Sequence, residues 1–530
     1  TYCSFVNMQK GMKFSLNKGF LEELPHDLVT ANIPRQVESV CYSFVSPQKT
    51  SNPQLLHVSP EMLQELGISE ATSKTQEFLD IFTGNRIYPN TKPFAMNYGG
   101  HQFGHWAGQL GDGRAINLFG VNYKNKTWML QLKGAGKTPY SRSADGLAVL
   151  RSSIREYLCS EAMFHLGVPT TRALSLSLTG DEVLRDMLYN GNAAYEKGAI
   201  VCRVSPSFLR FGSFEIFAAR EDYNTLKQLA DYTIKYHFPN LGEPSKETYI
   251  KFFAEVSRLT LELIIHWQRV GFVHGVMNTD NMSILGLTID YGPYGWLEGF
   301  DYGWTPNTTD AQHKRYRYGN QPNIALWNLY QLANALYPLI EETEPLEAIL
   351  NQFKTDFEIK SLAMMRAKLG LQKEASADAD LIKQLEDNLL ATETDMTIFF
   401  RKLADFNPKG SVDLRFVEDA FYNKEELVGT VKSNWEAWFA NYQKRLQIEI
   451  LSNADRKQHM NKVNPKYVLR NYMAQLAIDA AEKGDYGLID ELFRLLKKPY
   501  DEQPEHEKWF SKRPEWARHK VGCSMLSCSS

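Results

Sequence analysis

Alternating apolar and polar residues in the first third of the chain predict β-strands. In Trp128–Lys133 one face would carry a tryptophan and two leucines, which is the period of two that a strand shows. The segment Ala115–Val121 predicts a strand before it, and the polar residues 122–127 predict the turn between the two. A further strand is expected over Ala199–Val204. This part of the chain is therefore expected to form an antiparallel sheet.

The apolar spacing changes to three and four residues after these first two strands, which is the period of an α-helix. One face of this helix would carry Leu147, Leu150, Ile154, Leu158 and Ala162. Ser143 or Asp145 can cap its start, and Gly167 suits its end. From about Asn224 the pattern is helical, interrupted by a loop-and-strand block over residues 271–299. Strands followed by helices predict an α+β fold.

Composition excludes several classes of partner. The 530 residues are 43% hydrophobic and 23% charged, with a net charge of −3, which is ordinary for a globular protein. This charge argues against nucleic acid or an anionic membrane as the general partner. No apolar run approaches the roughly 18 residues of a membrane span.

The lack of a targeting pattern at residues 1–10 and the small number of cysteines indicate a reducing compartment. Residues 1–10 show neither a secretory signal pattern nor an arginine-rich transit pattern. The six cysteines are few and scattered. We therefore expect a cytoplasmic protein, with a mitochondrial location as the alternative if a transit peptide has been removed.

A glycine-rich turn, Gly108–Arg114, stands directly before the first predicted strand. Glycines let the backbone approach a phosphate closely. Lys133 follows on the second strand, and Glu156 lies on the predicted helix beside its apolar face. Each feature alone is typical of a turn or a solvated surface. Their order is that of a protein kinase, in which the lysine holds phosphate and the glutamate orients the lysine.

The segment His274–Asn281, with an Asp-Tyr-Gly sequence that begins at Asp290, is similar to a kinase catalytic loop. Kinases carry His-Arg-Asp, an asparagine five residues after that aspartate, and then Asp-Phe-Gly. Here Val276 takes the place of the catalytic aspartate, and Asp280 is available directly before the asparagine. Asn281 and Asp290 offer the oxygen ligands that magnesium prefers. An ordinary turn rich in Asn and Asp is the alternative interpretation.

These motifs divide the chain into four parts around a protein-kinase-like bilobal core. We expect an N-terminal extension over 1–95, the smaller lobe over 96–223, the larger lobe over 224–430, and a helical C-terminal region with a cysteine-containing tail over 431–530.

Longer strings around the motifs resemble one known family. The strings are Tyr98–Gly104, Gly108–Ala115, Leu130–Gly136, Thr138–Arg142, Arg151–Glu156, His274–Met282 and Asn464–Asn471. In them the sequence resembles the selenoprotein O or YdiU-type pseudokinases, from roughly residue 20 to the C-terminus. Members of that family are protein adenylyltransferases, which bind ATP reversed relative to a kinase and transfer AMP.

The resemblance implies a role for each candidate site residue. Asp280 would be the catalytic base, and Asn281 and Asp290 would hold magnesium, with manganese as the alternative. The ATP-binding residues would be Gly111, Gly113, Arg114, Lys133, Glu156, Asp145, Gly146, Arg203 and Arg210. The acceptors would be Ser, Thr or Tyr hydroxyls of target proteins, and we expect the enzyme to be a monomer.

Three other functions remain open from the sequence. One is a UMP transferase that uses UTP and manganese, and another is an ordinary kinase that transfers the terminal phosphate. The third is an inactive nucleotide-binding scaffold, which Val276 suggests. A scaffold has no physical need for a metal site, so Asn281 and Asp290 argue against it.

The C-terminal tail carries Cys523 and Cys528, which we expect to be exposed, with cationic neighbours that could lower the pKa of the Cys528 thiol. The resemblance implies a cysteine in the loop after the Asp-Phe-Gly-like motif, where this chain has Pro306. We therefore expect any disulfide to join Cys523 to Cys528. Cys159 and Cys202 fall within helix and strand patterns and are expected to be buried.

Overall fold

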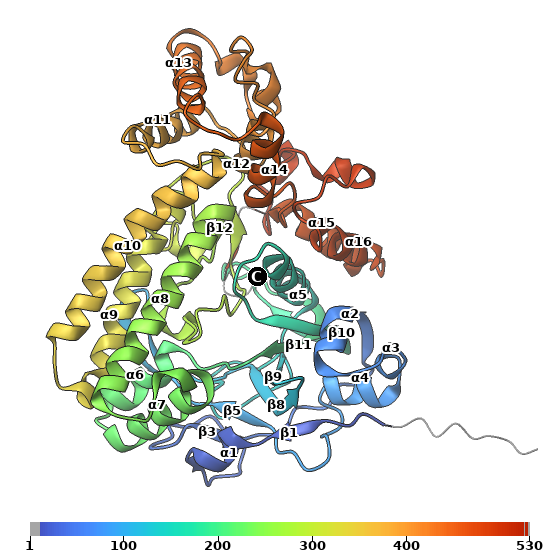
Figure 1. The fold of residues 1–530 in the computed structure, drawn as a ribbon. Coiled ribbons are helices and arrows are strands. Elements are labelled where there is room, and N and C mark those ends of the chain that lie inside the picture. Colours follow the sequence, from blue (N-terminus) through green and yellow to red (C-terminus); the bar gives the residue numbers. More distant parts are fainter. Residues whose placement is uncertain (1–10, 524, 528–530) are drawn as a thin grey trace, which may run out of the picture.

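A mixed β-sheet forms the centre of the computed structural model, which describes residues 11–523 and 525–527 (Figure 1). Among these residues nine strands build it, in the order β2-β3-β5-β8-β9-β11-β10-β4, with β1 beside β8. Their bounds are β1 Ser15–Asn17, β2 His26–Asp27, β3 Tyr42–Phe44, β4 Gln54–Val58, β5 Phe94–Met96, β8 Ala115–Tyr123, β9 Lys126–Lys133, β10 Arg172–Arg185 and β11 Ala194–Ser205. β2 and β3 run parallel, whereas β8, β9, β11, β10 and β4 are successively antiparallel. The predicted α+β class is confirmed.

The predicted hairpin of β8 and β9 has longer strands and a tighter turn than expected. Its ladder continues to the pair Tyr123 and Lys126, so that only Lys124 and Asn125 form the turn. Both have positive φ, 47° and 61°, as a two-residue type I′ turn requires. The six-residue turn expected over 122–127 is wrong, because polar residues can occupy the solvated end of a strand.

The helix that the three- and four-residue spacing predicted is α5 (Leu150–His165), but it begins later than expected. Leu147 and Val149 form β-bridges, so the chain runs extended along the sheet before the helix starts. Val149 is the N-cap, and no side chain caps this end. The expected caps at Ser143 and Asp145 are therefore wrong.

α5 ends as predicted, since Gly167 follows its last turn with φ 74°. The next element is β10, a long strand that the sequence analysis did not single out. Leu174, Leu176 and Leu178 nevertheless alternate with serines in this strand.

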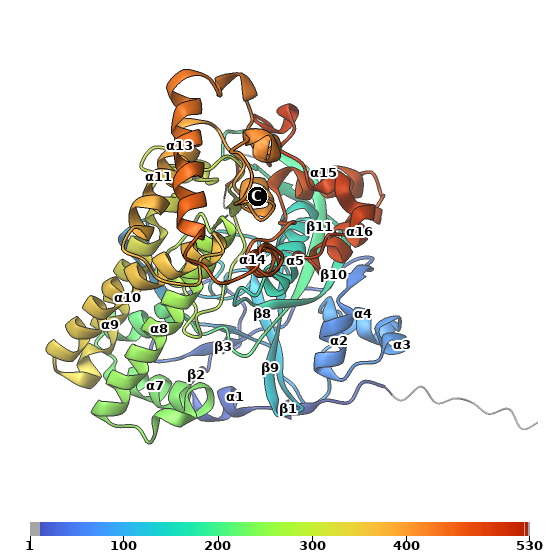
Figure 2. The same ribbon diagram turned by 45° about the horizontal axis from the view of Figure 1, so that its top comes forward.

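Helices flank the sheet and its loops (Figures 1 and 2). The smaller ones near the N-terminus are α1 Gly19–Glu23, α2 Pro60–Leu66, α3 Glu70–Ser73 and α4 Gln76–Phe82. The middle of the chain forms α6 Phe211–Ala219, α7 Tyr223–His237, α8 Lys246–Val270, α9 Gln321–Ile340 and α10 Glu344–Lys368. The C-terminal part forms α11 Asp378–Ala391, α12 Met396–Leu403, α13 Gly429–Leu446, α14 Asn453–Val463, α15 Asn471–Glu482 and α16 Gly487–Leu496.

Short elements between α8 and α9 form the loop-and-strand block that the sequence predicted. They are β12 Phe272–Val273, the 3-10 turn η2 Thr279–Asn281, and β13 Gly295–Trp296. A separate hairpin, β6 (Gly99–Gln102) and β7 (His105–Gln109), contacts η2. In the described part of the chain, no helix combines the length and apolar character that crossing a bilayer would require.

The C-terminal helices α15 and α16 pack on the centre of the molecule. α15 and α16 contact α5, and α5 also contacts β10 and β11, so this helix is buried on nearly every side. A polar residue on α5 therefore needs a partner inside the protein.

The tail lies against the loop that follows the Asp-Tyr-Gly motif. Leu526 N donates to Pro306 O over 3.1 Å, and Thr308 N donates to Leu526 O over 2.7 Å. Cys523 is only 1% exposed. The expectation that it is exposed is therefore wrong, because the tail packs against this loop. Cys528 lies outside the described residues, and its pairing with Cys523 stays a prediction. Three further cysteines are buried in the core, namely Cys41, Cys159 and Cys202. The sequence predicted this for Cys159 and Cys202.

Candidate active site

A cleft of about 690 Å³ opens between the sheet and the block that precedes α9. Eleven of the twelve candidate residues line it: Gly111, Gly113, Arg114, Lys133, Asp145, Gly146, Arg203, Arg210, Asp280, Asn281 and Asp290. The twelfth, Glu156, lies behind this wall and is 1% exposed. The fold thus brings all twelve to one place.

The glycine-rich turn is held in shape by the chain that follows β9. Gly111 has φ 71°, and a Cβ atom there would stand 2.4 Å from Cγ of Tyr140. Thr138 Oγ1 donates to the carbonyl of Asp112 over 2.7 Å. Because the tyrosine ring packs directly on the backbone, only glycine fits at this position.

Lys133 and Glu156 form an ion pair inside the protein. Lys133 ends β9 between β8 and β11, and its Nζ lies 2.6 Å from Oε2 of Glu156. Burial lowers the pKa of Lys133 below its ordinary value, although the glutamate acts in the opposite direction. The other glutamate oxygen, Oε1, accepts from Arg203 over 3.2 Å. Glu156 therefore orients both cations.

Asp290 forms ion pairs with two arginines. Arg203 Nη1 lies 2.8 Å from Oδ1, and Arg210 pairs with Oδ2. Burial alone would raise the pKa of Asp290, but the charges of Arg210 and Arg203 outweigh it and hold that pKa well below the usual range. Asp290 is therefore charged, and its side chain remains 23% exposed toward the cleft.

Asp280 has a different environment. Gln102 Nε2 donates to its Oδ2 over 3.3 Å, and its Oδ1 has no hydrogen-bond partner among the described residues. Burial raises the pKa of Asp280 to about 7, although Arg210 and Gln102 act to lower it. A carboxylate with this pKa can accept a proton near neutral pH.

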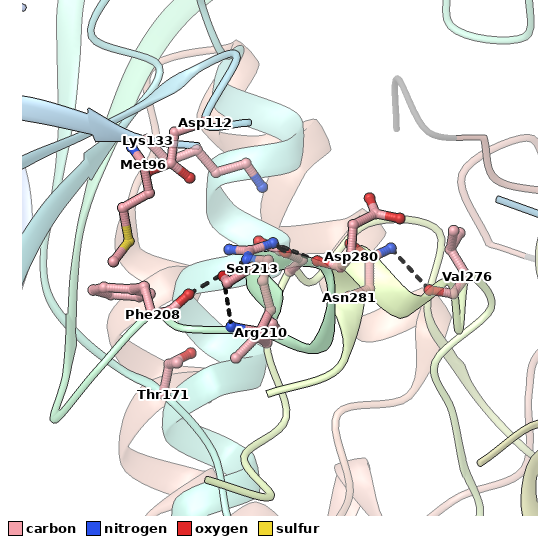
Figure 3. A network of polar contacts seen from close by, with 12 residues as sticks. Met96, Asp112, Lys133, Thr171, Phe208, Arg210, Ser213, Val276, Asp280 and Asn281 are labelled. Atoms are coloured by element: carbon pink, nitrogen blue, oxygen red, sulfur yellow. Dashed lines mark hydrogen bonds and ion pairs between the residues drawn. The ribbon is translucent and has the colours of Figure 1, made fainter. Parts of the chain in front are cut away.

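Asn281 is fixed beside Asp280 (Figure 3). Its Nδ2 donates to the carbonyl of Val276 over 2.9 Å, and Arg210 Nη1 donates to the carbonyl of Asp280 over 2.6 Å. The Val276 side chain is apolar and buried, so it cannot take a proton.

Sequence reasoning did not assign several residues that the fold adds to the cleft. Arg142, Arg185, Gln102 and Tyr98 all line it. Arg185, at the end of β10, pairs with Asp145 over 2.7 Å. Gln102 and Tyr98 belong to the string Tyr98–Gly104, one of those that carry the family resemblance. No comparable signal in the sequence pointed to Arg185.

Cations and carboxylates meet in the cleft from both walls. The cationic side chains that line it are Arg114, Lys133, Arg142, Arg185, Arg203 and Arg210. The aspartates that line it are Asp112, Asp145, Asp186, Asp280 and Asp290. The first group suits phosphate, and carboxylates such as those of the second are groups that can bind a metal cation.

Comparison with known proteins agrees with this chemistry. A family model described as "Protein adenylyltransferase SelO" matches residues 29–497. The chain belongs to the SelO family. It is 62% identical to "Protein nucleotidyltransferase YdiU" of Flavobacterium johnsoniae, over 97% of this chain and 99% of the relative. Proteins of the same name in Rhodopirellula baltica and Aromatoleum aromaticum are 54% and 53% identical, over 96% and 97% of this chain and 98% and 99% of the relatives.

The predicted family is therefore confirmed, and the chain is an enzyme of the nucleotidyltransferase class. The SelO match covers every candidate residue of the cleft, from Gly111 to Asp290.

Proposed function

We propose that this SelO-family chain transfers AMP from ATP to Ser, Thr or Tyr hydroxyls of target proteins, on a kinase-like core. The observation that carries the proposal is the convergence of Asp280, Asn281 and Asp290 with Lys133 and Arg203 in one cleft. A protein acceptor is supported by the names of the relatives, which are protein nucleotidyltransferases.

The order of elements supports the kinase-like core. A glycine turn precedes β8, Lys133 ends β9, and Glu156 lies on α5 and pairs with that lysine. Asn281 and Asp290 follow in the loops after α8. These are the positions that a kinase gives to its nucleotide-binding groups.

The donor atoms fit a magnesium ion, or a manganese ion. Asn281 directs its amide nitrogen to Val276, and its amide oxygen has no hydrogen-bond partner within the described part of the chain. Asp290 supplies a charged carboxylate that faces the cleft. Asn281 and Asp290 would hold the ion, which would neutralise phosphate charge when bound.

Val276 and Asp280 together favour AMP transfer over ordinary phosphorylation. A kinase takes the acceptor proton at the position of Val276, where this chain has a buried apolar side chain. In the proposed reaction Asp280 accepts the proton of the acceptor hydroxyl, and the hydroxyl oxygen forms a bond to the α-phosphorus. The bond from that phosphorus to the bridging α–β oxygen breaks, and pyrophosphate leaves.

Mass spectrometry of modified acceptor peptides tests this proposal. The enzyme is incubated with a protein mixture and either ATP or UTP, with magnesium or manganese, and Asp280→Asn serves as the control. We expect AMP on Ser, Thr or Tyr with ATP, lost in the control. Peptides that carry only phosphate would establish a kinase, and UMP formed in preference to AMP would change the donor to UTP.

A further inference from the structure

The hairpin of β6 and β7 is fastened to the loop that carries Asp280. The backbone N–H of His101 donates to Thr279 Oγ1 over 2.7 Å, and that of Phe103 donates to Asn278 Oδ1 over 3.1 Å. Together with the bond from Gln102 to Asp280, three consecutive hairpin residues hold three residues of the loop. The loop therefore takes its shape from the hairpin as well as from its own turn.

Among the described residues, Gln102 alone gives the Asp280 carboxyl group a side-chain hydrogen bond, through Oδ2. The second oxygen faces the hairpin backbone, because a Cβ atom on Gly100 would stand 2.9 Å from Oδ1. The carboxyl group is thus confined on one side by backbone and directed on the other by an amide. Gln102 and Asp280 both line the cleft.

We infer that Gln102 is a positioning residue for the reaction, which fixes the orientation of the Asp280 carboxyl group toward the acceptor hydroxyl. This inference rests on the proposed function, in which Asp280 takes the acceptor proton. A proton acceptor must lie within hydrogen-bond reach of the hydroxyl and in the right direction, and a freely rotating carboxyl group meets this condition only part of the time.

The choice of an amide at this position has a physical reason. Two arginines bind Asp290 and hold it as a permanent anion. A cation on Asp280 would compete in the same way with the acceptor hydroxyl. The neutral amide of Gln102 gives direction without the Coulomb attraction that a second full charge would add.

A double-mutant cycle tests the inference in the full-length chain. Gln102→Leu keeps the size of the side chain but removes the donor. We expect kcat for protein modification to fall about 10- to 100-fold, the scale of one lost hydrogen bond to a charged group. The KM for ATP should stay within about twofold, because Gln102 acts on the base and not on the nucleotide. In an Asp280→Asn background the same substitution should lower kcat little further, since the effects of residues that act as a unit are not additive.

Gln352→Leu, on α10, is the matched control. Its amide donates to the carboxylate of Asp356 over 2.8 Å, which is the same kind of bond outside the cleft. We expect kcat of this variant to stay near that of the wild type. Gln102→Glu provides a second variant in case the leucine prevents folding, and it should also lose activity because it replaces the donor by a carboxylate.

Two outcomes would overturn the inference. One is a wild-type kcat in Gln102→Leu, and the other is an equal loss from this substitution in the wild-type and Asp280→Asn backgrounds. Wild-type activity in Asp280→Asn itself would instead refute the proposed base, whatever Gln102 does. The cycle therefore separates failure of the inference from failure of the proposed function.

Discussion

Asp280 and Asp290 face one cleft in opposite electrostatic environments. Two arginines keep Asp290 charged, whereas burial raises the pKa of Asp280 to about 7. Carboxylates that their surroundings separate in this way commonly divide the roles of proton transfer and charge binding. The sequence predicted both residues as site candidates, but only the fold shows how differently their surroundings treat them.

Replacing Asp280 by asparagine tests its role at the residue scale. We expect turnover to fall about 10²- to 10⁴-fold, the usual contribution of a general base. The melting temperature should change little, because the substitution keeps the shape and removes a carboxyl group that burial disfavours. Asp186→Asn, at another aspartate of the cleft, controls for the loss of a nearby charge. Full activity in Asp280→Asn would remove this residue from the reaction.

Arg203 and Arg210 have a structural contact as well as the proposed nucleotide contact. Each is at most 5% exposed and pairs with Asp290. We expect alanine at either position to reduce transfer and also to cost about 1–3 kcal/mol of stability, since a buried charge loses a partner. Lysine should rescue poorly because it cannot reproduce the fork of a guanidinium. Steady-state kinetics and thermal unfolding measure the two effects separately, and unchanged kinetics in both alanine variants would exclude them from the site.

At the scale of elements, local periodicity found β8, β9 and α5 but not their limits. The start of α5 was misjudged because Leu147 and Val149 pair with the sheet, a contact that depends on residues far along the chain. The same limitation applies to the site. The order of Lys133 and Glu156 suggested their pairing, whereas no local pattern indicates that Gln102 reaches Asp280.

The glycine turn before β8 offers a test at the element scale with a matched control. Gly111 and Gly108 have the same φ of 71°, so alanine meets similar backbone strain at both. Only at Gly111 would the new Cβ atom collide with Tyr140, since nothing lies within 4 Å at Gly108. We expect Gly111→Ala to weaken ATP binding and stability much more than Gly108→Ala, by calorimetry and thermal unfolding. Equal effects would show that the packing of Tyr140 does not shape the turn.

At the scale of the whole molecule, Glu298 connects segments that are far apart in sequence. It is 6% exposed, its backbone oxygen accepts from Met396, and its side chain lies 3.2 Å from Arg513. Burial raises its pKa to about 7, although Arg470 and Arg513 act to lower it. The C-terminal segment thus contacts the block that precedes α9, through the pair of Arg513 and Glu298.

The protonation of Glu298 should make stability depend on pH. The folded pKa of about 7 is above the ordinary glutamate value of 4.5, so the folded state binds the proton more tightly than the unfolded chain. The resulting stabilisation is complete below about pH 4.5 and is lost as the pH rises through 7. We expect Glu298→Gln to reduce the loss of melting temperature between about pH 5.5 and about pH 8.5, a range that spans the folded pKa. An unchanged slope would place the titration elsewhere.

The packing of the tail alters the cysteine reactivity that the sequence suggested. The sequence suggested exposed thiols with cationic neighbours, but Arg513 pairs with Glu298 and Lys520 pairs with Asp479. Burial raises the pKa of the Cys523 thiol to about 11, although Lys520 acts to lower it. Cys523 is therefore a poor nucleophile near neutral pH.

Transfer of labelled phosphate tests the central claim most directly. The enzyme is incubated with an acceptor protein and ATP labelled at either the α or the γ phosphate, and the protein-bound label is counted. The account predicts covalent label from the α position, none from the γ position, and loss of the α signal in Asp280→Asn. Label from the γ position alone would contradict it.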